Sequence, residues 1–174
     1  TPRRDRVADY PTWDDKEAIF RVPTLYKSIQ DQDKSGEYPI ILTSGRLVEY
    51  EGGGEETRSN PWLAELQQEM FVEVNPKDAN DIGFKDGDDV WVEGAEKGRI
   101  KVKAMVTRRV KPGLAFLPFH FGGKFEGEDL RSKYPEGTDP YVIGESANTA
   151  TTYGYDPVTL MQETKVTLCN IRKA

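Results

Sequence analysis

Short runs in which apolar and polar residues alternate dominate the middle of the chain. Apolar residues take every second position over residues 99–106, a period of two that is typical of a strand with one buried face. The same alternation predicts half-buried strands over residues 71–75 and 89–93. Three more strands are predicted: one of the buried type over residues 39–42, an apolar strand over residues 114–119, and a last strand over residues 166–171.

Two short helices are predicted between these strands. One covers residues 61–70, with Asn60 as its N-cap and Pro61 at its first position. The other covers residues 75–83 and is ended by Gly83. No long helix of the kind that joins parallel strands is visible. The pattern therefore predicts a mainly β fold with short helices, and a closed barrel in preference to a doubly wound sheet.

Two stretches lack such periodicity. Residues 1–36 are polar with widely spaced aromatic residues, and we interpret residues 1–37 as an N-terminal arm or linker that lies over a domain formed by residues 38–174. A short helix capped by Thr12 is possible within residues 14–18. Residues 124–145 read as a long polar loop, and loops of that length are usually functional or contact a partner.

Composition narrows the classes of function. The 174 residues carry a net charge of −6, which argues against nucleic acid as a partner, and no apolar run is long enough for direct membrane insertion. The single cysteine, Cys169, excludes an internal disulfide and is expected to be a buried small hydrophobe. The chain begins at Thr1, which indicates a processed chain or an excised piece of a longer protein. Its compartment, periplasmic or cytoplasmic, stays open.

Candidate chemistry is concentrated directly after the first predicted strand. That strand runs into Thr43, Ser44, Gly45 and Arg46, and a run of three glycines follows at residues 52–54. Gly45 would allow a ligand to approach the backbone, and the Arg46 guanidinium suits a phosphate or carboxylate. A tight turn with a plain surface loop explains these residues equally well.

Two further segments could contribute to a site. His120, the only histidine, lies between aromatic residues at the end of a strand, where it is either a structural hydrogen-bonding group or a ligand contact. No Ser–His–Asp triad or metal site can be built around it. Residues 147–157 are rich in donors, acceptors and aromatic faces suited to a heterocyclic ligand, or they form an Asx-type turn that caps a helix.

Taken in order, these motifs resemble the C-terminal dinucleotide-binding domain of the molybdopterin oxidoreductases, the dimethyl sulfoxide reductase superfamily. The similarity is greatest to the alpha (large) subunit of formate dehydrogenase and covers residues 38–171. The motifs that carry it are Thr43-Ser44-Gly45-Arg46, Thr57-Arg58, Pro61-x-Leu63, Val74-Asn75-Pro76-x-Asp78-Ala79, Asp86-Gly87-Asp88-x-Val90, Pro118-x-His120, Asn148-x-x-Thr151, Asp156 and Glu163-x-Lys165.

The resemblance implies a six-stranded double-psi β-barrel that helps to hold bis-molybdopterin guanine dinucleotide with molybdenum or tungsten. Many members have histidine or tryptophan after the arginine loop, where this chain has Glu49-Tyr50-Glu51. The cofactor contacts implied by the family pattern are Thr43, Ser44, Gly45, Arg46, Glu49, Tyr50, Gly52, Gly53, Thr57, His120, Asn148, Thr149 and Lys165.

The resemblance also implies what this chain lacks. The family's metal-ligating cysteine or selenocysteine, its iron–sulfur cluster and its catalytic histidine–arginine pair lie in other domains. We therefore expect no catalytic residue and no metal ligand here, and no formate oxidation by this chain alone. The expected partners are the remaining domains of the large subunit and the electron-transfer subunits. The alternative is a barrel without cofactor that acts as a protein-interaction module.

Overall fold

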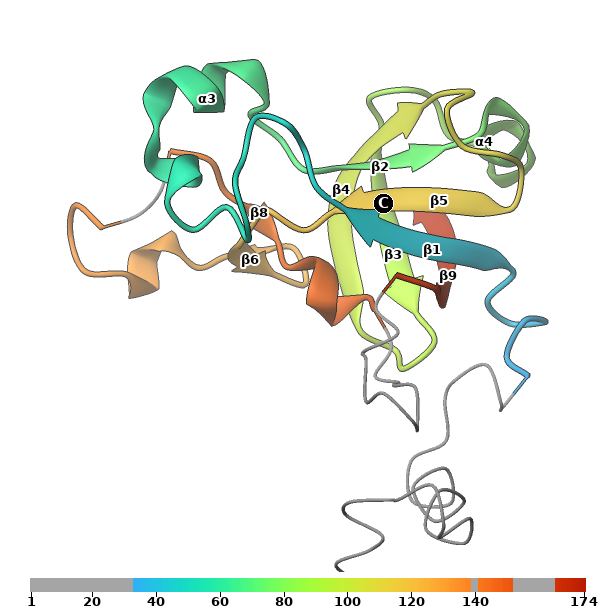
Figure 1. The fold of residues 1–174 in the computed structure, drawn as a ribbon. Coiled ribbons are helices and arrows are strands. Elements are labelled where there is room, and N and C mark those ends of the chain that lie inside the picture. The colour runs from blue at the N-terminus through green and yellow to red at the C-terminus, as the bar shows by residue number, and fades with distance from the viewer. Residues whose placement is uncertain (1–32, 139–140, 152–164) are drawn as a thin grey trace, which may run out of the picture.

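Six strands pair edge to edge until the last one meets the first. The computed structural model describes residues 33–138, 141–151 and 165–174, and in these residues the strands close a barrel in the order β1-β5-β2-β4-β3-β9 (Figure 1). This confirms the predicted mainly β fold and its six-stranded barrel. The barrel strands are β1 (Ile40–Gly45), β2 (Phe71–Val74), β3 (Asp89–Gly94), β4 (Arg99–Val106), β5 (Leu114–Pro118) and β9 (Thr167–Lys173).

The strand directions decide which segments meet. β1 runs parallel to β5 and antiparallel to β9, and β2 runs parallel to β4. The pairs β2–β5, β3–β4 and β3–β9 are antiparallel. As a result the last residues of β1, β3 and β5 lie at the same end of the barrel as the first residues of β2, β4 and β9. We call this end the β1 exit end.

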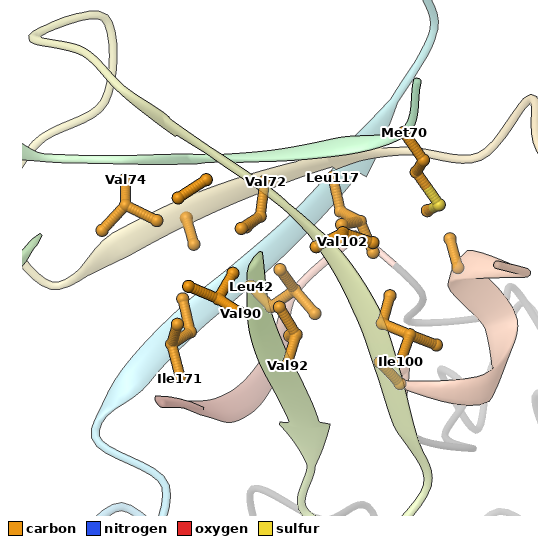
Figure 2. Packing of buried hydrophobic residues seen from close by; sticks show 14 of the residues in the cluster. Leu42, Met70, Val72, Val74, Val90, Val92, Ile100, Val102, Leu117 and Ile171 are labelled. Carbon is orange, nitrogen blue, oxygen red and sulfur yellow. The ribbon is translucent and has the colours of Figure 1, made fainter. Parts of the chain in front are cut away.

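Alternate residues of the strands point inward and fill the barrel. Leu42, Val72, Val90, Ile100 and Leu117 come from five different strands, and each is fully buried (Figure 2). Burying such aliphatic side chains is the main favourable contribution to a fold of this size. Cys169 of β9 is also fully buried, as predicted, and burial raises the pKa of its thiol to about 12.

Within the described residues, two α-helices lie between the barrel strands. α3 (Pro61–Leu66) is capped by the Asn60 side chain, which accepts the N–H groups of Trp62 and Leu63. It ends four residues before the predicted position, because Gln67 leaves the helical conformation and the chain extends toward Met70, which is buried in the core. α4 (Pro76–Ile82) agrees with the prediction, and Gly83 ends it with a φ of 94°.

Strand β2 is buried on both faces, so the predicted half-buried strand is wrong. Glu73 on its outer side is only 4% exposed. Its cross-strand neighbours, Met105 on β4 and Phe116 on β5, flank it on that side. Arg109 reaches the carboxylate, with Nη1 lying 3.0 Å from Oε1. The pattern could not reveal this because the covering residues are distant in sequence.

The predicted long loop contains a small sheet, which is a correction to the prediction. β6 (Gly123–Phe125) pairs with β7 (Glu128–Asp129) and with β8 (Gly144–Glu145), and the 3-10 helix η3 (Arg131–Lys133) lies between β7 and β8. The fully buried Glu145 ties this sheet to the barrel, because it accepts the backbone N–H groups of Lys101 in β4 and Gly127. Strands this short leave too little pattern to be predicted.

Some predictions lie outside the described residues. These are the arm over residues 1–32, with its possible helix at 14–18, and the part of the donor-rich segment within residues 152–164. The proposed boundary between arm and domain at residue 37 stays a prediction. No helix in the described ranges is long and apolar enough to cross a membrane.

Replacement of Leu42 by alanine should destabilise the barrel by about 2–5 kcal/mol, because it leaves a cavity where the fully buried side chain stood. Ile41→Ala is the matched control on the same strand, since its side chain is 44% exposed on the outer face. Chemical denaturation of the two variants measures the difference. Equal losses in both would contradict this assignment of inward and outward positions.

Candidate functional site

Two cationic side chains meet over one aromatic ring at the β1 exit end. The Arg46 Cζ atom lies 5.4 Å from the centroid of the Phe119 ring, and the Lys165 Nζ atom lies 4.3 Å from it. Lys165 Nζ also donates a hydrogen bond of 3.4 Å to the Ser44 hydroxyl. Backbone pairing explains the convergence: Arg46 follows β1, Phe119 follows the parallel β5, and Lys165 precedes β9.

The structure pairs neither of these two charges with an acidic side chain of residues 33–138, 141–151 or 165–174. Within the part of the chain that the structure describes, neither Arg46 nor Lys165 forms an ion pair with a carboxylate. Partial burial, and then the neighbouring charge of Arg46, lower the pKa of Lys165 from its ordinary value. Two close cations without a counterion favour the binding of an anion that carries several negative oxygens, such as a pyrophosphate.

The loop that follows β1 is built around His120. The imidazole is fully buried, and its Nε2 atom accepts the backbone N–H of Leu47 at 2.8 Å. Nε2 is therefore unprotonated, and the neutral ring carries its proton on Nδ1. Gly54, with a φ of 84°, packs directly against the backbone of His120, where a Cβ would lie 2.6 Å from the carbonyl oxygen.

Burial is the largest effect that lowers the pKa of His120, and the charges of Arg46 and Arg58 act in the same direction. The backbone of Glu51 and the charge of Glu49 oppose them. The net result is a neutral imidazole that can keep accepting the Leu47 N–H. His120 therefore holds the loop from behind, and its side chain has no exposed surface on which a ligand could rest.

Tyr50 supports the same loop from inside. It is 4% exposed, its ring lies 5.8 Å from those of His120 and Phe121, and its hydroxyl donates to the Gln67 carbonyl after α3. Tyr50 thus anchors the loop, and its predicted contact with the cofactor stays a prediction. Tyr50 connects the loop to the segment between α3 and β2.

Arg58 is a residue of the site region that we did not single out from the sequence. It lies in the 3-10 helix η2 (Thr57–Ser59), and its Nε donates to the Gly54 carbonyl at 3.1 Å. Its Nη1 atom comes so close to Gly122 that a Cβ there would lie 2.7 Å away. Because Arg58 directly follows Thr57 in the family motif, the motif itself was the available signal.

The other predicted contacts differ in accessibility. Five of them are exposed: Arg46, Gly52, Gly53, Asn148 and Lys165. Ser44, the second-last residue of β1, is only 8% exposed. The Thr57 hydroxyl accepts the backbone N–H of Glu51 at 3.2 Å. The remaining half-buried residues of the predicted set are Thr43, Gly45, Glu49, Thr57 and Thr149.

Asn148 and Thr149 also lie at the β1 exit end, but they belong to a different element from Arg46 and Lys165. They belong to the 3-10 helix η4 (Ala147–Thr149), which packs on the turn between β3 and β4 through close contacts with Gly94 and Gly98. In the described residues no hydrogen bond or ion pair joins them to Arg46 or Lys165. The structure thus brings Ser44, Arg46 and Lys165 together and places Asn148 and Thr149 on a neighbouring element.

A metal site is not apparent in the described residues. No group of three or more His, Cys, Asp or Glu side chains within them could hold a metal ion. The groups that the site does present are two cations, a hydroxyl, an aromatic ring and a glycine-containing loop, which suit an anion with polar groups.

Comparisons with known proteins agree with a receptor of this class. Residues 40–168 match the family described as Molydopterin dinucleotide binding domain, and the chain belongs to that family. It is 37% identical over 146 residues to the formate dehydrogenase 2 subunit alpha (cytochrome c-553) of Nitratidesulfovibrio vulgaris, which covers 79% of this chain and 13% of that protein. It is 33% identical over 137 residues to the periplasmic nitrate reductase of Desulfovibrio desulfuricans, covering 78% and 17% respectively.

A solved structure shares the fold. The acetylene hydratase from Pelobacter acetylenicus superposes with a TM-score of 0.62 at 20% identity, over 86% of this chain and 20% of that one. The resemblance read from the sequence is thereby confirmed: this is a molybdopterin dinucleotide-binding domain of the kind found in molybdopterin oxidoreductases. The chain spans 13% and 17% of the lengths of the two relatives, which are larger chains with further domains.

The His120–Leu47 hydrogen bond predicts a pH dependence of stability. Because folding lowers the pKa of His120 from 6.5, the neutral form is favoured in the fold, and its stabilising contribution is present above pH 6.5 and lost as the pH falls below it. Free energies of unfolding measured from pH 8 to pH 5 test this. His120→Gln keeps an acceptor that does not titrate, so the acid-induced loss should be smaller in the variant. Parallel curves for the two proteins would contradict the assignment.

Proposed function

We propose that this chain is the cofactor-binding domain of a molybdenum or tungsten formate dehydrogenase large subunit, and that it holds the guanine dinucleotide of bis-molybdopterin guanine dinucleotide at the β1 exit end. Family membership supports a molybdopterin dinucleotide as the ligand. Formate as the substrate of the whole enzyme is supported by the names of several relatives, whereas the similar nitrate reductase shows that the domain also serves other reactions.

The observation that carries the proposal is the pair of cations on Phe119. The dinucleotide contains a pyrophosphate, and Arg46 and Lys165 present two positive charges without carboxylate partners in the described residues. The residues present therefore fit an anionic ligand. In this proposal Arg46 and Lys165 contact the pyrophosphate. Ser44, Asn148 and the N–H groups of the glycine loop contact the polar edges of base and ribose.

The remaining predicted contacts take two roles. Thr43, Gly45, Glu49, Gly52, Gly53, Thr57 and Thr149 retain accessible surface and can lie against the ligand. Tyr50 and His120 act from behind, since they shape the loop that carries Arg46 and Leu47. When bound, the metal and pterin supply the redox chemistry that converts formate to CO2, and this domain supplies binding and orientation.

We also propose that the domain works only with the rest of its polypeptide and with electron-transfer subunits. Among the described residues, several large apolar side chains are exposed on segments that connect strands at the β1 exit end. Trp62 and Leu66 on α3 are 78% and 68% exposed, and Tyr141 is 72% exposed. Protein surface contacting this end would bury these side chains together with the dinucleotide.

The first test is Arg46→Ala and Lys165→Ala in the full-length enzyme, with metal and pterin content measured per subunit. A charge-assisted hydrogen bond contributes on the order of 1.5–3 kcal/mol, so each variant should retain the cofactor about tenfold less tightly or worse. Lys77→Ala is the matched control, because that lysine forms an exposed ion pair with Asp81 on α4, at the other end of the barrel.

The control separates a local effect from a change in net charge. Full occupancy in both site variants would end the proposal, and the chain would then be better described as a protein-interaction module without cofactor. Equal losses in Lys77→Ala would show that overall charge, not the Phe119 site, governs retention.

A second test concerns activity of the chain by itself. We expect no formate oxidation by the purified chain with an artificial electron acceptor, even when metal and pterin are supplied. The physical reason is that Cys169, its single cysteine, lies in the barrel core with a raised thiol pKa. Turnover by the purified chain would place the catalytic centre in this domain and overturn the proposal.

A further inference from the structure

Two glycines in the turn between β3 and β4 are in closer contact with another segment than any side chain would allow. A Cβ on Gly94 would lie 2.0 Å from the carbonyl oxygen of Ala150, and a Cβ on Gly98 would lie 1.9 Å from that of Thr149. Both contacts are with backbone atoms, which cannot rotate away as the end of a flexible side chain can. The space that a side chain would need is therefore occupied by η4 and the residue after it.

The backbone conformation does not explain these glycines. Gly83, Gly87, Gly113 and Gly137 have φ between 76° and 94° with no atom within 4 Å of an added Cβ, so there the left-handed conformation favours glycine. Gly94 and Gly98 show the opposite combination. Neither has a positive φ, and a Cβ added to either would collide with a carbonyl oxygen. Their role is close approach between two backbones.

The turn is itself held rigidly. The Gly94 N–H donates to the Gly98 carbonyl at 2.8 Å, and the Lys97 N–H donates to the Gly94 carbonyl at 2.8 Å. The Ala95 N–H donates to the Leu168 carbonyl of β9 at 3.2 Å, which fixes the turn to the strand that begins beside Lys165. The surface on which η4 rests is thus tied directly to the part of the barrel that carries the cation site.

η4 in turn carries an exposed polar residue. Its N–H groups at Thr149 and Ala150 bond back to the carbonyls of Ser146 and Ala147, both at 3.0 Å, which gives the segment a defined shape. Asn148 is exposed at its centre, and its side chain makes no hydrogen bond within the described residues. An exposed amide of this kind can donate to and accept from a ligand.

From this geometry we infer that Gly94 and Gly98 are positioning residues that set the distance of Asn148 from the Arg46–Phe119–Lys165 site, and so the length of the ligand that spans the two. This rests on the proposed dinucleotide function. Arg46 and Lys165 hold the charged middle of the ligand, and the η4 amide holds a polar group farther along it. A methyl group on Gly98 displaces η4 outward and weakens the second contact without changing the first.

The test uses the full-length enzyme and the amount of guanine nucleotide released by acid hydrolysis per subunit after dialysis. Loss of one well-placed hydrogen bond should lower retention about fivefold to tenfold in both Gly98→Ala and Asn148→Ala. If Gly98 acts through Asn148, the double variant should lose no more than either single variant. Hydrogen exchange at Thr149 and Ala150 should be faster in Gly98→Ala, and the stability of the barrel should match that of the control.

Gly36→Ala is the control, because Gly36 has no positive φ and no atom within 4 Å of an added Cβ. Unchanged retention in Gly98→Ala, or losses that multiply in the double variant, would overturn the inference. Failure of both Gly94→Ala and Gly98→Ala to fold would also overturn it, since the glycines would then serve folding rather than position. Arg46→Ala is run in parallel: if it retains the nucleotide, the proposed function fails, whereas a loss there with full retention in Gly98→Ala sinks only the positioning role.

Discussion

The pairing of β1 with both β5 and β9 is the constraint on which the rest of this structure depends. β1 contributes Leu42 to the core and at the same time closes the barrel. Because β5 runs parallel and β9 antiparallel to it, residues that follow β1 and β5 and precede β9 emerge at one end. A shift of register by one residue would turn Leu42 outward and Ile41 inward, so burial of the core also fixes the position of Arg46.

The cation site carries an electrostatic cost, because Arg46 and Lys165 place two positive charges near one ring. Arg46 and Lys165 both lie close to the Phe119 ring, and the pKa of Lys165 is lowered first by its partial burial and then by the charge of Arg46. The cation–π contacts with the ring offset part of the cost. Locally unfavourable interactions, such as two neighbouring like charges, are characteristic of functional sites. The loop behind it is stabilised differently, by the buried His120 acceptor and by Tyr50.

Particular residues show why some elements could be predicted and others could not. The cap at Asn60, the Pro-initiated helix α4 and the strand at 99–106 depend on interactions within a few residues, so their patterns are visible in the sequence. The small sheet β6–β8 depends on Glu145 reaching the backbone of Lys101 across 44 residues. The burial of Glu73 likewise depends on neighbouring strands. Neither has a local signal.

The candidate site likewise has features that the sequence reveals locally and features that depend on distant segments. By itself the sequence determined the barrel and the family, because alternation and motif order are properties of the chain read in order. Only the tertiary structure decided that Arg46 and Lys165 share one ring, that His120 and Tyr50 face inward, and that the segment carrying Asn148 packs on two glycines of a distant turn. Those facts depend on distances between segments, and such distances are set by strand register and packing rather than by local composition.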